Sequence, residues 1–72
     1  MTSTTESFGQ RLRLERHRQA LSQDELATVA GISRITVIQL ESDTSERQPR
    51  PSTVRKLARA LGVRPAQLTT PT

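Results

Sequence analysis

The segment LATVAGISRITVIQLE, residues 26–41, places two helix-like runs on either side of a single glycine. Gly31 suits the positive-φ conformation that ends many helices, and Ser33 is a good N-cap for the run that follows. The expected helices, 23–30 and 34–42, are therefore joined by about three residues, a connection that holds two helices at a fixed, steep angle. This corner restricts the possible folds more than any other feature of the chain.

Length and composition exclude several classes of protein. A chain of 72 residues has material for one small core and not for two. It has no cysteine and one histidine, His17, so disulfides, thiolate metal sites and His-rich sites are excluded, and we expect no metal and no cofactor. No apolar run approaches the roughly 18 residues that span a bilayer, and the first residues lack the basic-then-apolar order of a signal peptide. The sequence thus predicts a cytoplasmic protein with no membrane partner.

The charge of the chain points to an anionic partner. Eleven Lys+Arg against seven Asp+Glu give a net charge of +4, and ten of the eleven basic residues are arginine. The planar guanidinium suits phosphate and guanine, so nucleic acid is the first partner to consider. Charge alone does not decide the matter, because small basic surfaces are common on proteins of other kinds.

Capping boxes mark the starts of two expected helices. Ser7 with Gln10 three residues later begins a helix over 8–19, and Ser22 with Glu25 repeats the signal for the helix before Gly31. In each pair the serine can accept from a backbone N–H of the first turn, and the longer side chain can accept from the serine N–H. Both helices therefore have locally defined beginnings.

The second half of the chain carries two further expected helices. The polar stretch 42–51, which contains two prolines, indicates a loop of about ten residues. A helix over 52–61 follows, with a core-facing stripe at i, i+3, i+4 and i+7 made by Val54, Leu57, Ala58 and Leu61. Gly62 ends this helix, and Pro65 lies in the first turn of a last short one. The sequence predicts an all-α domain over 7–68, with a disordered tail at 1–6 and a frayed end at 69–72.

The helix expected at 34–42 has apolar residues on two opposite sides. At roughly 100° per residue, Val37 and Leu40 point to one side, and the opposite side gathers Ile35, Ile38, Gln39 and Ser42. Exposed isoleucines suit a helix in a DNA major groove, where methyl groups can pack on thymine, glutamine can pair with adenine, and the neighbouring Arg34 can pair with guanine. The alternatives are that Ile35 or Ile38 packs under the loop or in a protein interface. Together with the tight corner, this face predicts a helix-turn-helix.

With these residues identified, the sequence resembles the phage repressor and Cro family, also called the XRE family, of helix-turn-helix transcription regulators. The resemblance covers about residues 8–68 and rests on the segments LRLER, LSQDELA, AGIS, LE at 40–41, and RKLARALGV. It implies a compact fold of four or five helices and sequence-specific binding of double-stranded DNA through the major groove. The implied role is transcriptional regulation, with repression, including autoregulation, as the favoured mode. It also implies a weak or DNA-induced homodimer, for which the last helix with Val63 and Leu68, or the long loop, is the expected contact surface.

The resemblance further implies individual roles on the DNA side. The base-reading positions are Arg34, Ile35, Ile38 and Gln39, and the phosphate-binding positions are Gln23, Ser33, Thr36, Arg47 and Arg50. Gln23 is also expected to brace the start of the helix over 34–42. The chain departs from the family in the loop over 42–51, which has about three additional residues, so the loop contacts of Arg47 and Arg50 are carried over less directly.

Arg16 and Glu41 match an ion pair of the family, located close to the DNA backbone. The apolar periodicity agrees, because both residues lie at the border of an inward face and partly buried charges need partners. For Arg16 two roles stay open at this point, namely bracing the helices without touching DNA and binding a phosphate directly. Glu41 is structural in either case.

Other functions have less support in the sequence. There is no nucleophile–base arrangement, glycine-rich phosphate loop or metal-ligand cluster, so we expect no enzyme. A membrane-surface helix is disfavoured, because Glu15 and His17 interrupt the basic run of the first helix. The main rival is an antitoxin or adaptor whose helix-turn-helix domain chiefly binds a protein.

Overall fold

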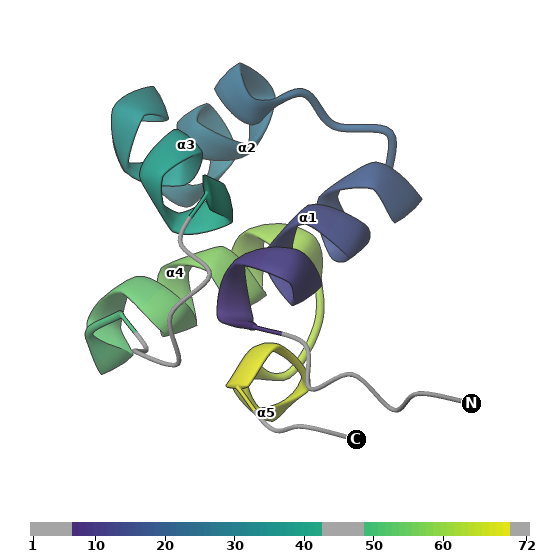
Figure 1. The fold of residues 1–72 in the computed structure, drawn as a ribbon, viewed down its shortest axis with the longest axis vertical. Coiled ribbons are helices and arrows are strands. Elements are labelled where there is room, and N and C mark those ends of the chain that lie inside the picture. The colour runs from purple at the N-terminus through teal and green to yellow at the C-terminus, as the bar shows by residue number, and fades with distance from the viewer. Residues whose placement is uncertain (1–6, 43–48, 70–72) are drawn as a thin grey trace.

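The computed structural model describes residues 7–42 and 49–69, and in this part of the chain it shows five α-helices and no strand (Figure 1). The all-α prediction is therefore confirmed. The helices are α1 (Phe8–Arg18), α2 (Gln23–Ala30), α3 (Arg34–Ser42), α4 (Pro51–Leu61) and α5 (Pro65–Thr69).

Local signals position the first three helices as expected. At α1 the Gln10 N–H donates to Ser7 Oγ over 3.2 Å and the Ser7 N–H donates to Gln10 Oε1 over 2.9 Å. The same reciprocal bonds join Ser22 and Glu25 at α2, at 3.0 and 2.8 Å. Gly31 ends α2 in the left-handed conformation with φ 74°, which an L side chain adopts only at a cost.

The core lies between all five helices, and its fully buried side chains are Leu12, Leu26, Val37, Leu57, Leu61 and Leu68. α3 packs against α1 and α2, whereas α4 packs against α2 and α5, and α5 also reaches α1. In Figure 1, α2 and α3 form one end of the molecule and α4 and α5 the other, with α1 alongside both. α3 thus uses one side for packing and leaves the other to solvent.

Three helix boundaries differ from the predictions. α4 begins at Pro51, one residue earlier than expected, because proline fits the first helical position and Arg50 serves as the N-cap with φ −60° and ψ 146°. α1 ends at Arg18, with Gln19 as its C-cap. α5 extends through Thr69, which was expected to fray, and its hydroxyl donates to the carbonyl of Pro65 over 3.3 Å.

The two apolar residues expected to take part in self-association both lie against the protomer's own core. Leu68 is fully buried, and Val63 packs against the core. These side chains stabilise the protomer itself, because a core this small needs every apolar group that the last helix can supply. Leu68 is therefore not available to a second copy, whereas Val63 is only partly buried.

Several expectations fall on segments outside the description. They are the tail at 1–6, the loop residues 43–48 with Arg47, and the end at 70–72. In the described ranges no helix has the length and apolarity required to cross a membrane.

Candidate nucleic-acid interface

The corner between α2 and α3 holds α3 at the surface of the molecule. The N–H groups of Gly31 and Ile32 both donate to the carbonyl of Ala27, over 2.9 and 3.0 Å. These bonds cap the C-terminal end of α2. Ile32 then packs against the core, and Val37 one turn into α3 is fully buried. These anchors on either side of the corner leave α3 little freedom to tilt.

The solvent side of α3 carries the residues expected to read bases. Ile35 is 65% exposed, the highest value among the exposed large apolar side chains of the described residues. Arg34 and Gln39 are also exposed, whereas Ile38 is half-buried. The difference follows from helix geometry, because Ile38 lies roughly 60° around the axis from Ile35 and so nearer the packed side. The outward placement is confirmed for Ile35 and only in part for Ile38.

Ser33 and Thr36 form a hydroxyl pair at the start of α3. The Thr36 N–H donates to Ser33 Oγ over 3.1 Å, and the two hydroxyl oxygens lie 2.7 Å apart. One of the two hydroxyl hydrogens is used between them, so the other can donate to an external acceptor. The predicted N-cap role of Ser33 is confirmed, and a single phosphate oxygen would suit the remaining donor.

Arg16 of α1 holds the last turn of α3 through a buried ion pair with Glu41. Its Nε donates to Glu41 Oε2 over 2.6 Å and its Nη2 to Glu41 Oε1 over 3.0 Å, while its Nη1 donates to the carbonyl of Leu21 over 2.7 Å. The side chains are 10% and 5% exposed for Arg16 and Glu41. Nη2 also lies 3.2 Å from Nε2 of His17, which must be the acceptor because a guanidinium only donates. Nearly all donors of Arg16 are satisfied within the protein, so the geometry favours the bracing role over a direct phosphate contact.

Gln23 joins the same cluster at a different point from the one expected. Its Nε2 donates to Glu41 Oε1 over 3.1 Å, so it braces the C-terminal end of α3 and not its start. The prediction was wrong here because the partner is set by the crossing of α2 and α3, which the sequence spacing does not show. Gln23 is half-buried at the first position of α2.

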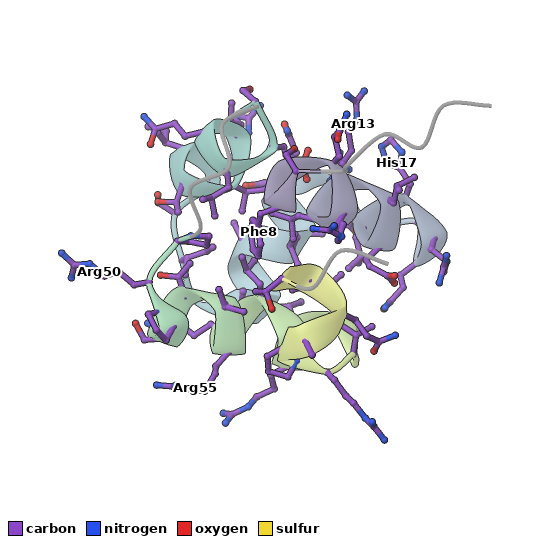
Figure 2. The ribbon with its side chains drawn as sticks, turned by 60° about the horizontal axis from the view of Figure 1, so that its bottom comes forward. Phe8, Arg13, His17, Arg50 and Arg55 are labelled. Atoms are coloured by element: carbon purple, nitrogen blue, oxygen red, sulfur yellow. The ribbon has the colours of Figure 1, made fainter. Side chains whose placement is uncertain are left out.

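The remaining basic candidate of the described part is Arg50. It is exposed at the N-cap of α4 and extends away from the body of the molecule (Figure 2). It does not share a helix with the face of α3, and Arg47, expected beside it, lies outside the described residues. The structure therefore brings together Arg16, Gln23 and Glu41, leaves the face of α3 open, and places Arg50 apart.

Sequence reasoning missed two polar side chains that build this scaffold. Gln19 donates from Nε2 to the carbonyl of Leu61, and so ties the end of α1 to the end of α4. Arg11 is only 8% exposed. It flanks the apolar stripe of α1 on the side opposite to Arg16. Arg11 directly precedes the buried Leu12, and this position beside the apolar stripe was the available signal.

The exposed face of α3 carries groups that are suited to binding. Among the described residues no group of three or more His, Cys, Asp or Glu side chains could hold a metal ion. What α3 offers is an arginine, an amide and an isoleucine side by side on a rigidly held helix. These are donor, acceptor and apolar groups of the kind that recognise base edges in a major groove.

Comparisons with known proteins agree with this geometry. A family model described as helix-turn-helix, HTH_3, matches residues 12–68. The HTH-type transcriptional repressor RghR of Bacillus subtilis (strain 168) is 38% identical over 58 residues, which make up 81% of this chain and 42% of RghR. The chain thus spans less than half the length of this relative.

Two solved structures share the fold. The restriction-modification controller protein C.AhdI from Aeromonas hydrophila is 39% identical with a TM-score of 0.75, over 85% of this chain and 89% of that one. The P22 c2 repressor in complex with a synthetic operator is 27% identical with a TM-score of 0.80, over 92% of this chain and 97% of that one. With the family model matching most of its length, the chain belongs to the helix-turn-helix family of the phage repressor and Cro (XRE) type.

Proposed function

We propose that this protein binds double-stranded DNA sequence-specifically by placing α3 in the major groove, and that it acts as a transcriptional repressor. The observation that carries the proposal is the exposed face of α3, with Ile35 65% exposed between Arg34 and Gln39. In the free protein this isoleucine leaves apolar surface in contact with water, whereas packing against a thymine methyl would remove that surface from water.

The roles divide between base edges and phosphates. Arg34, Ile35, Ile38 and Gln39 read bases, of which Arg34 and Gln39 make the hydrogen-bonded contacts. Ser33, Thr36, Gln23, Arg47 and Arg50 bind phosphates and set the register of the protein on the duplex. Arg16 and Glu41 keep α3 in place beneath the groove.

Repression is the mode that the relatives favour. RghR is named a transcriptional repressor, and the P22 c2 repressor is seen on a synthetic operator. A body this small can block a promoter by occupancy alone, and an operator upstream of its own gene would make the protein autoregulatory. Two protomers bind each palindromic site, as a weak or DNA-induced homodimer.

The test is selection of duplexes from a random library, followed by fluorescence-anisotropy titration of the selected duplex and a scrambled control at two salt concentrations. We expect the selected duplex to bind at least about a thousandfold more tightly than the control, with a steep salt dependence for both. The matched variants are Arg34→Ala, which removes a base contact, and Arg13→Ala, which removes an exposed arginine of α1. Equal weak binding to both duplexes would refute sequence-specific recognition and direct attention to a protein partner.

A further inference from the structure

The solvent side of α4 carries three basic side chains, Arg55, Lys56 and Arg59, which we call the α4 basic face. All three are exposed, and so is Arg64 just beyond the helix. No ion pair joins any of them to a carboxylate within residues 7–42 and 49–69. From Arg47 to the last residue the chain has six basic residues and no acidic one.

The α4 basic face is not needed for the packing of the helix that carries it. The packing side of α4 is complete without it, since Val54, Leu57 and Leu61 are all buried. Arg55 and Arg59 are four residues apart, a spacing at which like charges on a helix repel each other. This set of exposed cations, without a carboxylate partner in the described part of the chain, is available to an external anion.

This face points away from α3. α4 packs on α2 and α5, whereas α3 packs on α1 and α2. Figure 2 shows Arg55 directed away from the body of the molecule, on the side opposite to Arg13 and His17 of α1. A short duplex is stiff, because the persistence length of DNA is about 150 base pairs. One short duplex on α3 would therefore reach the α4 basic face only by bending.

The chemistry of the face fits a phosphate backbone better than a protein. The exposed large apolar side chains of the described residues are Leu14, Val29 and Ile35, and none of them lies on α4 or α5. Protein interfaces rely on buried apolar and aromatic anchors, which this surface lacks. Cations four residues apart, about 6 Å along the axis, instead suit the dense, regular charge of a nucleic-acid strand.

We propose that the α4 basic face binds the phosphate backbone of a second DNA segment while α3 occupies its operator, so that one protein body bridges two duplexes. This inference rests on the proposed function, because the first duplex is held by α3. The second segment is held without regard to sequence, since only phosphates are contacted.

The test is a capture assay with the full chain. A selected duplex is fixed on beads and saturated with protein, and capture of a fluorescent duplex of scrambled sequence is measured at low and at physiological salt. Wild type should capture the second duplex, and Arg55→Gln with Arg59→Gln should weaken capture about tenfold while binding of the fixed duplex changes less than about twofold. The matched control is Arg13→Gln with Arg18→Gln, which removes two exposed arginines from α1 and should leave capture intact.

The other outcomes contradict the proposal in distinguishable ways. If wild type binds the fixed duplex and captures no second one, the bridging inference fails and the proposed function stands. If both double variants lose capture equally, net charge and not this face is responsible. The α4 variant could instead weaken binding of the fixed duplex itself. If fluorescence energy transfer between the two ends of that duplex then reports a bend, the α4 basic face holds flanking DNA of the same duplex. If wild type binds no fixed duplex, the proposed function fails as well.

Discussion

The guanidinium of Arg16 meets the carboxylate of Glu41 at two points, Nε to Oε2 at 2.6 Å and Nη2 to Oε1 at 3.0 Å, and thereby ties α1 to the last turn of α3. Gln23 of α2 donates to the same carboxylate, so three helices converge on one buried group. Because α3 carries the exposed face, this cluster determines how that face is presented.

Removing one partner of this pair should destabilise the fold strongly. In Arg16→Met the carboxylate of Glu41 keeps only the Gln23 amide, so the free energy of unfolding should fall by about 3 kcal/mol, measured by urea denaturation. Arg18→Met is the matched control, since Arg18 is 73% exposed and pairs with Glu15 at 3.4 Å, and it should cost at most about 0.5 kcal/mol. The double change Arg16→Met with Glu41→Leu should recover much of the loss. A loss as large for Arg18→Met as for Arg16→Met would contradict the assignment.

Two backbone positions should respond to substitution in opposite directions. Ala20 lies at φ 57° between α1 and α2, a conformation that costs an L residue about 1 kcal/mol, so Ala20→Gly should raise the melting temperature. Gly31→Ala should lower it by a similar free energy, although a Cβ there would meet nothing within 4 Å, because the penalty arises from φ 74°. Thermal unfolding by circular dichroism measures both. Equal signs for the two changes would rule out this explanation.

Arg34 and Gln23 should affect DNA recognition differently. Arg34→Ala should relax the preference at one base pair by about 1–3 kcal/mol, because a base-edge contact is lost. Gln23→Ala should weaken binding to all sequences more evenly, since it removes a phosphate contact and loosens Glu41. Titration of each variant against duplexes with every single-base change measures the pattern. Uniform scaling of all duplexes by both variants would show that the roles are not divided in this way.

Ile35 on the exposed face of α3 should contact the methyl group of a thymine. Replacing that thymine by deoxyuridine removes only the methyl group and should weaken wild-type binding about fourfold, from roughly 0.8 kcal/mol of apolar contact. In Ile35→Ala the same replacement should have little effect. A scan of every thymine in the selected duplex locates the position, and an Ile35→Ala protein as sensitive to the scan as wild type would place the contact elsewhere.

Self-association should depend on DNA. With Leu68 and Val63 used in the core, the free protein should sediment as a monomer at micromolar concentration and as two copies per duplex on a palindromic site. Sedimentation velocity with and without duplex measures both states. A tight dimer in the absence of DNA would contradict a DNA-induced assembly.

Features that depend on residues close together in the sequence could be predicted, whereas features that depend on residues far apart could not. The capping boxes at Ser7 and Ser22, the left-handed Gly31 and the stripe of α4 were predictable, because each depends on residues within about two turns of one another. The pairing of Arg16 with Glu41 was found through the family pattern, and the exposure of Ile35 and the burial of Val37 were found through helical periodicity.

By itself, the sequence determined the number and order of the helices, the tight corner before α3 and the outward direction of Ile35. Only the tertiary structure decided that Gln23 bonds to Glu41, that Gln19 caps α4, that Ile38 is half-buried and that Leu68 closes the core. Bonds such as these join residues 18 and 42 positions apart, so they depend on how helices cross after packing. The physical reason is that hydrogen bonding and burial across a core are set by the relative placement of whole helices, which no local pattern encodes.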